Sequence, residues 1–175
     1  MPHLLRYIWY AFVLVVVQVF VIQNINILGP ISNFFTPCIY VALIVGFPAD
    51  APRSVQYLYA FSLGLSVDML SGTLGMHAFT STMAMGLREL SFRWVLNRSI
   101  DTVTDVINVH TIERRAFISI AAIVVTAHHF VLFLMDDMNL VNLPWVVLRT
   151  ICSSILTLAF IMFIQTYYIN KKKYR

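Results

Sequence analysis

Long hydrophobic stretches follow one another along this chain, separated by short polar or turn-forming segments. Runs such as Phe12–Val17 and Ile120–Val125 are apolar at every position, which differs from the alternation expected of a membrane β-barrel strand. Stretches of about 15 to 25 such residues can cross a hydrocarbon core of about 30 Å as helices. The pattern predicts an all-α membrane protein with six transmembrane helices, over Tyr7–Ile22, Ile31–Phe47, Ser54–Ser71, Met76–Val95, Arg115–Met135 and Pro144–Tyr168.

Glycine and proline mark the expected ends of several of these helices. Turn-forming residues lie between the spans at Gly29, Pro30, Pro48–Pro52, Gly72 and Gly75. Pro37 falls inside the second span, and because proline lacks an N–H and crowds the preceding turn, we expect it to kink that helix.

Composition excludes an ordinary water-soluble domain. Of 175 residues, 59% are hydrophobic and 11% are charged, whereas a soluble domain is about half apolar and about a quarter charged. We expect one integral membrane domain over residues 1–175 and a first helix that is retained, because no Ala-x-Ala-like cleavage site follows it. Cys38 and Cys152 lie in apolar stretches and do not indicate a disulfide framework.

The positive charges are distributed asymmetrically across the predicted spans. Arg149 alone falls toward one side, near Asp136 and Asp137, and the other eleven of the twelve Lys and Arg residues fall toward the opposite side: Arg6, Arg53, Arg88, Arg93, Arg98, Arg114, Arg115, Lys171, Lys172, Lys173 and Arg175. Because cytoplasmic loops carry the basic excess, both termini are expected in the cytoplasm. The net charge of +4 then favours anionic lipids rather than nucleic acid as the partner.

The longest segment between spans, Leu96–Arg114, has a helical apolar spacing at Leu96, Ile100, Val103 and Ile107. Two interpretations are open. It is a linker that rests on lipid headgroups, or an amphipathic helix that docks a cytoplasmic partner.

Asp68 is the most informative polar residue, because a carboxylate inside a membrane span costs several kcal/mol unless it is paired, protonated or hydrated. Small residues accompany it at a four-residue spacing on the third span, at Ala60, Gly64 and Gly72, and a similar stripe on the fourth span comprises Ala78, Thr82 and Gly86. Such stripes let helix backbones approach closely. We therefore expect a tight hairpin of the third and fourth helices, with Asp68 facing protein.

Several basic side chains could pair with Asp68 at a similar depth, namely His77, Arg149, His128 and His129. For Arg149, the alternative is that it extends to the outer headgroups, and for Asp68 it is a proton-relay or substrate-binding role. His128 and His129 are adjacent, so they point about 100° apart and do not suit one metal ion. No catalytic, cofactor or metal site is expected, since neither a His-Glu-x-x-His motif nor a Gly-x-Ser-x-Gly elbow is present.

The order of these features resembles the MreD family, a small membrane component of the bacterial rod-shape machinery. The resemblance covers nearly the whole chain and rests on the six-span layout, on Phe47-Pro48 at the end of the second span, and on a pattern of an aromatic, Gly and Asp followed by Gly and a small residue. Phe61, Gly64, Asp68, Gly75 and Ala78 match that pattern.

The resemblance implies a non-enzymatic scaffold of the cytoplasmic membrane that binds MreC and links MreB filaments to the peptidoglycan synthases, the glycosyltransferase RodA and its class B transpeptidase. It also implies a fold similar to the substrate-binding components of energy-coupling-factor vitamin transporters, which gives the alternative function. Such components carry Ala-x-x-x-Ala on the first helix, whereas here Val15 follows Ala11. A third class, an ion channel or proton carrier, would need polar residues through the whole membrane, and below Asp68 the third helix has only Ser62 and Ser66.

Overall fold

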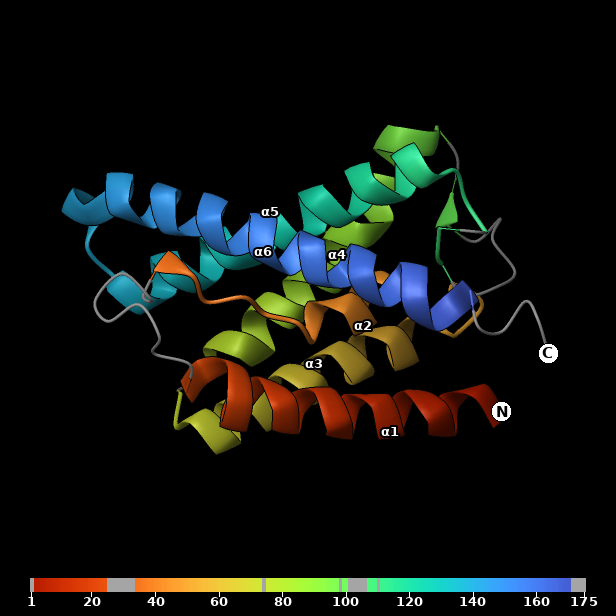
Figure 1. Ribbon diagram of the computed structural model, residues 1–175, viewed down its shortest axis with the longest axis horizontal. Coiled ribbons are helices and arrows are strands. Elements are labelled where there is room, and N and C mark those ends of the chain that lie inside the picture. The colour runs from red at the N-terminus through yellow and green to blue at the C-terminus, as the bar shows by residue number, and fades with distance from the viewer. Residues whose placement is uncertain are drawn as a thin grey trace.

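The computed structural model describes residues 2–24, 34–73, 75–97, 99–100, 107–109 and 111–170, and this part of the chain is all-helical (Figure 1). The helices are α1 (Pro2–Val16), continued by the π-helix η1 (Val17–Val21) and the 3-10 helix η2 (Ile22–Asn24), then α2 (Val41–Val45), α3 (Arg53–Ser71), α4 (Met76–Leu96), α5 (Arg114–Asp137), the 3-10 helix η5 (Leu140–Asn142) and α6 (Leu143–Asn170). The expected first, third, fourth, fifth and sixth helices are confirmed as helices.

Successive long helices pack beside one another, α3 on α4, α4 on α5 and α5 on α6. The α3–α4 and α5–α6 connections are short, whereas a longer segment joins α4 to α5. Figure 1 shows that α1 begins and α6 ends at the same end of the molecule. The short helix α2 contacts both α4 and α5, and Ile44 and Val45 on it are fully buried. The core therefore lies around α2, inside the layer of long helices.

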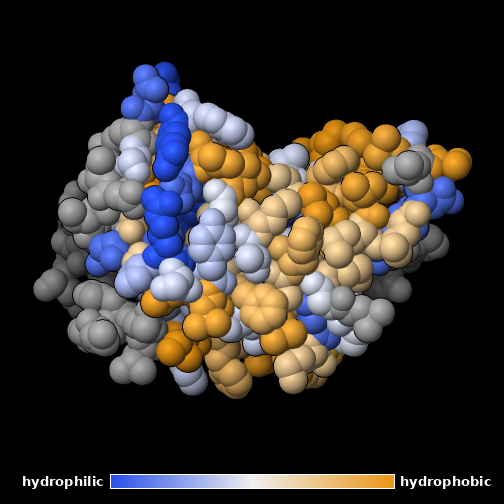
Figure 2. Space-filling view, turned by 180° about the vertical axis from the view of Figure 1, so that it is seen from behind, coloured by the Kyte–Doolittle hydropathy of each residue, from blue (hydrophilic) through white to orange (hydrophobic). Residues whose placement is uncertain are grey.

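Three of these segments are long and apolar enough to cross a membrane, namely Tyr7–Asn24, Arg114–Asp137 and Leu143–Thr166. The surface of the protein is also apolar, because large apolar side chains such as Phe20, Leu58 and Ile155 are each more than 60% exposed. Figure 2 shows hydrophobic side chains over the middle of one face, with hydrophilic side chains gathered toward one end. Apolar exposure on this scale is typical of a protein surrounded by lipid, which supports a membrane protein.

The expected second helix over Ile31–Phe47 is wrong within the described residues. Only Val41–Val45 forms α-helix, and residues 34–40 are mostly irregular, although Pro37 to Tyr40 are buried. Proline has no N–H to donate and disfavours helical geometry at the residue before it. Pro37 therefore does more than kink a helix, because regular helix begins only after it.

Residues 98, 101–106 and 110 of the Leu96–Arg114 segment lie outside the described residues, so neither interpretation of it is decided. Leu96 is the last residue of α4, and of the other apolar positions Ile100 and Ile107 are buried.

Exposed arginines gather at the end where α1 begins and α6 ends. Arg53 opens α3, Arg93 lies in the last turn of α4, and Arg115 lies in the first turn of α5. The Glu89 carboxylate forms ion pairs with Arg53 at 2.9 Å and with Arg93 at 2.8 Å. The opposite end carries Asp136 and Arg149.

Arg88, which we counted with these surface charges, is instead fully buried. Its Nη2 donates to the carbonyl of Phe47 at 2.5 Å, and its Nη1 lies 3.2 Å from the Met85 sulfur. Arg88 therefore joins α4 to the end of the α2 region rather than adding to the headgroup-facing charge.

The two ends of α5 test the orientation. A cysteine that replaces Met138, which is 87% exposed just after α5, should react with a membrane-impermeant maleimide added to intact cells. A cysteine that replaces Arg115 should react only after permeabilisation, because the basic end of the bundle is expected on the cytoplasmic side. The unmodified chain gives the background from Cys38 and Cys152. The reverse labelling pattern would contradict the orientation.

Candidate functional site

Asp68 closes the turn between α3 and α4. Its Oδ1 accepts a hydrogen bond from the backbone N–H of His77 at 3.1 Å, and its Oδ2 accepts one from the N–H of Ala78 at 2.8 Å. The hydroxyl of Thr73 also donates to Oδ1. The side chain is 2% exposed. Asp68 thus satisfies free N–H groups at the start of α4, where the helix dipole also favours a negative charge.

The predicted close approach of α3 and α4 is present at Gly64. A Cβ atom at this position would lie 2.2 Å from the carbonyl oxygen of His77 and 2.6 Å from the Cα of Ala78. These are backbone atoms of the first turn of α4, so they cannot rotate away. The position requires glycine because a helix backbone occupies the place of a side chain.

Gly72 does not take part in this packing, contrary to the expectation from its spacing. An added Cβ would meet no atom within 4 Å, but the residue has φ +69° and forms the left-handed C-cap of α3. Gly75 has φ +79° at the start of α4. Both glycines serve the turn, because left-handed geometry is costly for residues with a side chain.

The expected pairing of Asp68 with Arg149 or a histidine ring is not formed. Arg149 donates from Nη1 to Asp136 at 2.7 Å, and its guanidinium carbon lies 4.1 Å from the centre of the Phe133 ring. Asp68 finds its donors in the adjacent turn, and Arg149, near the start of α6, meets the end of α5 instead. The short η5 connection brings these last two groups together.

The ring of His77 belongs to a buried polar chain that includes Tyr40. The Tyr40 hydroxyl lies 2.8 Å from His77 Nδ1 and 2.9 Å from His128 Nε2. Thr80 Oγ1 lies 3.2 Å from the same His128 nitrogen. This chain joins the α2 region, α4 and α5 through the core.

The irregular segment before α2 obtains its hydrogen bonds from side chains of other helices. Gln18 Nε2 donates to the Pro37 carbonyl at 3.0 Å, and its Oε1 accepts the N–H of Ile39 at 2.9 Å. On the other side, Ser153 Oγ accepts from the N–H of Thr36 at 3.1 Å and donates to the Phe34 carbonyl at 3.0 Å.

Thr157 completes this set. Its Oγ1 accepts the N–H of Cys38 at 3.1 Å and lies 3.3 Å from His129 Nε2. Non-helical backbone can persist at membrane depth only where protein supplies such partners. The polar side chains of η1 and α6 therefore make the irregular segment possible.

A cavity of about 200 Å³ opens beside the α3–α4 turn. His77 and Thr73 line one side, Asp136 and Arg149 another, and Gln18 and Cys38 lie on the side of the irregular segment. Two of the expected site residues, His77 and Arg149, thus meet at one cavity, whereas Asp68 and Gly64 hold the adjacent turn together.

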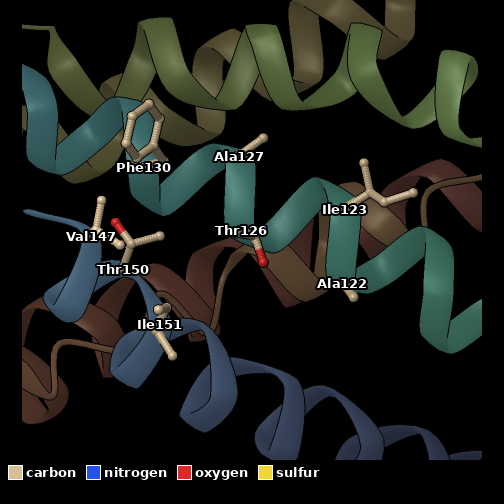
Figure 3. Close-up of a pocket in the computed structure, with 8 residues that line it drawn as sticks. All are labelled: Ala122, Ile123, Thr126, Ala127, Phe130, Val147, Thr150 and Ile151. Atoms are coloured by element: carbon tan, nitrogen blue, oxygen red, sulfur yellow. The ribbon is translucent and has the colours of Figure 1, made fainter.

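A second, open groove of about 530 Å³ lies between α5 and α6. Small or apolar residues line it, and Figure 3 shows them on facing sides of the gap: Ala122, Ile123, Thr126, Ala127 and Phe130 on α5, and Val147, Thr150 and Ile151 on α6. Thr150 is 3% exposed and its hydroxyl has no hydrogen-bond partner among the described residues.

The described residues bring no three His, Cys, Asp or Glu side chains together as a metal site. Comparison of the chain with protein-family models, with curated proteins and with solved structures gave no match.

Sequence reasoning missed the residues that hold the irregular segment. The sequence signal at Gln18 is a glutamine within the apolar run Phe12–Ile22, which indicates a hydrogen-bond partner in the fold without identifying it. Ser153 and Thr157 gave no comparable signal, because a Ser or Thr hydroxyl can bond to a carbonyl of its own helix. A single tyrosine such as Tyr40 does not indicate where its hydroxyl bonds.

Gly64→Ala tests the close approach of α3 and α4. We expect a loss of about 1–3 kcal/mol in the free energy of unfolding, because the methyl group would overlap backbone atoms of α4. Gly86→Ala is the matched control, since its Cβ would meet only the outer part of the Tyr57 side chain, with the hydroxyl at 3.1 Å, and that side chain can move. Unfolding of both purified variants in mixed detergent micelles measures the difference. Equal stability of the two variants would contradict the packing argument.

Proposed function

We propose that this chain is an MreD-like scaffold of the bacterial cytoplasmic membrane, which binds MreC and helps to connect MreB filaments to RodA and its class B transpeptidase. The α3–α4 hairpin is the observation that carries the proposal. Four of the residues on which the resemblance rests lie in this hairpin and help to form it. Gly64 contacts α4, and Asp68 accepts hydrogen bonds from the first turn of α4. Gly75 and Ala78 lie at the start of α4.

The hydrogen bonding of Asp68 supports a structural rather than a catalytic role. Both carboxylate oxygens accept hydrogen bonds from backbone N–H groups, and the side chain is almost fully buried. A general base or nucleophile needs a free oxygen within reach of a substrate. Both oxygens of Asp68 are engaged by the α3–α4 turn, and its burial leaves a substrate no open approach.

The charged end of the bundle supports the proposed orientation. Arg53, Arg93 and Arg115 would lie at the cytoplasmic headgroups, close to MreB filaments, and the end with Asp136 and Arg149 would face outward, where the peptidoglycan synthases work.

The groove between α5 and α6 is the proposed docking place of the membrane helix of MreC. Ala122, Thr126 and Ala127 are small enough to let a third helix approach α5 closely. A partner helix would thus contact two helices of the scaffold at once.

The alternative is a substrate-binding component of an energy-coupling-factor vitamin transporter, and the polar cavity is the observation that favours it. Its volume of about 200 Å³ is below the range of about 300–1,000 Å³ typical of small-molecule sites. In addition, Val15 is 5% exposed, so this position on α1 packs inside the protein rather than toward a coupling subunit. Both observations favour the scaffold.

Widening one side chain in the groove tests the docking place. Ala127→Phe should fill the gap and reduce the amount of MreC that remains bound after gentle detergent extraction about tenfold, because a lost interface contact of about 1.4 kcal/mol changes affinity tenfold. Ile155→Phe, at a 63% exposed position of α6 outside the groove, is the control and should retain MreC. Quantitative immunoblotting of the purified complex gives the ratio. Retention of a vitamin instead of MreC by the unmodified chain would favour the transporter component.

Asp68→Leu tests whether the hairpin matters for assembly. The variant should still insert, because leucine is favourable in a membrane helix, but it leaves the N–H groups of His77 and Ala78 without their acceptor. We expect complex formation with MreC to fall several-fold while the amount in the membrane fraction stays near that of the unmodified chain. Asp50→Leu, at an exposed position before α3, is the control. Full complex formation by Asp68→Leu would contradict the proposal.

A further inference from the structure

The cavity beside the α3–α4 turn contains charged groups of both signs. Arg149 and Asp136 form its ion pair, so these two groups together contribute no net charge. Asp136 is 45% exposed and Arg149 29% exposed, which places the pair where the cavity opens. His77, in contrast, is 6% exposed and forms part of the inner wall.

The hydrogen bonds behind His77 assign the position of its proton. Thr80 Oγ1 lies 2.8 Å from the carbonyl of Met76 and 3.2 Å from His128 Nε2. The shorter contact favours donation of its single hydroxyl hydrogen to Met76, and Thr80 then accepts from His128 Nε2. A neutral His128 therefore carries its proton on Nε2 and shares it between Thr80 and Tyr40. The buried Nδ1 of His128, which has no partner among the described residues, then carries no hydrogen. An unpaired acceptor there avoids the cost of a buried N–H without an acceptor.

The same reasoning continues through Tyr40 to the cavity. Because the Tyr40 oxygen accepts from His128, its own hydrogen is available for His77 Nδ1 at 2.8 Å. A neutral His77 whose Nδ1 accepts carries its proton on Nε2. Among the described residues, none bonds to that nitrogen, which belongs to a side chain on the cavity wall.

Arg149 supplies a second donor group. Its Nη1 donates to Asp136, and its side chain remains 29% exposed where the cavity opens. A guanidinium carries several N–H groups, so one ion pair does not use its whole donor capacity. The cavity is thus lined by a guanidinium and an imidazole, and Asp136 presents a carboxylate at its mouth.

We infer that this cavity binds a zwitterionic group in which an oxyanion lies next to an ammonium, as in the phosphoethanolamine headgroup of a lipid. The oxyanion accepts from the Arg149 guanidinium and His77 Nε2, and the ammonium donates to Asp136. A purely anionic group is disfavoured because it would meet the Asp136 carboxylate without compensation. This inference does not rest on the proposed scaffold function.

Size and surroundings fit a headgroup. A volume of about 200 Å³ holds the equivalent of about six or seven waters at about 30 Å³ each, which is enough for a phosphate with a short amine. Ile22, Met76 and Leu132 also line the cavity, and such apolar side chains provide a surface for the first carbons of acyl chains. A free zwitterion has the same polar chemistry but lacks these apolar contacts.

Native mass spectrometry of the full chain in mild detergent tests the inference. Phosphatidylethanolamine and phosphatidylglycerol of identical acyl chains are titrated separately, and phosphatidylethanolamine is expected to bind about tenfold more tightly. Arg149→Gln should reduce its binding about tenfold, since it removes a charge-assisted donor. Arg53→Gln, which breaks an ion pair at the other end of the bundle, should have no effect.

Asp136→Asn gives a change of preference that does not depend on a loss of folding. With the carboxylate removed, the charge of Arg149 is uncompensated, and phosphatidylglycerol should become the tighter ligand. Asp50→Asn is the matched control and should keep the original preference. Equal binding of the two lipids to the unmodified chain, or an unchanged preference in Asp136→Asn, would overturn the inference.

A soluble competitor separates the two sources of the group. If glycerophosphoethanolamine displaces the lipid, the cavity recognises the free zwitterion as well, and if it does not while the lipid preference persists, the ligand is the membrane lipid. Both outcomes support the site. Equal competition by glycerol phosphate, which has no ammonium, would overturn the zwitterionic assignment.

Discussion

Backbone N–H and C=O groups that lie away from water must find partners within the protein, and this constraint explains the placement of most buried polar side chains here. Regular helix satisfies its own backbone except at its ends and where proline interrupts it. Asp68 supplies the acceptors at the start of α4, and Gln18 and Ser153 supply partners around Pro37. The irregular segment and the tight hairpin exist because side chains distant in sequence complete their hydrogen bonds.

The remaining buried polar groups have a different arrangement. Tyr40, His77 and His128 bond mainly to one another, and at one end their chain reaches a cavity that also exposes Arg149. Groups that bond to the backbone stabilise the fold, whereas groups that face a cavity with free donors can bind a ligand. The same molecule therefore combines a helical framework held by side chain–backbone hydrogen bonds with a polar opening near the end of the bundle.

Hydropathy and turn residues were sufficient to predict five of the long helices and the hairpin. Apolar runs such as Ile120–Val125 have no stable alternative to helix in lipid, and Gly72 and Gly75 allow the left-handed geometry that a short turn requires. Gly64 was predictable from its spacing with Ala60 and Asp68, because small residues along one helix face indicate a close neighbour. These features depend on local geometry and on solvent preference, both of which are written in the sequence.

The second helix, the partner of Arg149 and the role of Gln18 were decided by tertiary structure alone. Hydropathy indicates that residues 34–40 are buried away from water. It does not indicate whether their backbone groups form hydrogen bonds within a helix or with Gln18, Ser153 and Thr157. Likewise, the charge of Asp68 and its depth in the membrane are compatible with several partners. In the structure, its partners are the N–H groups of His77 and Ala78, which the fold brings close to it. The sequence by itself thus determined which segments are helical and apolar, whereas hydrogen-bond pairing depends on distances of a few ångströms between helices that only the packed structure defines.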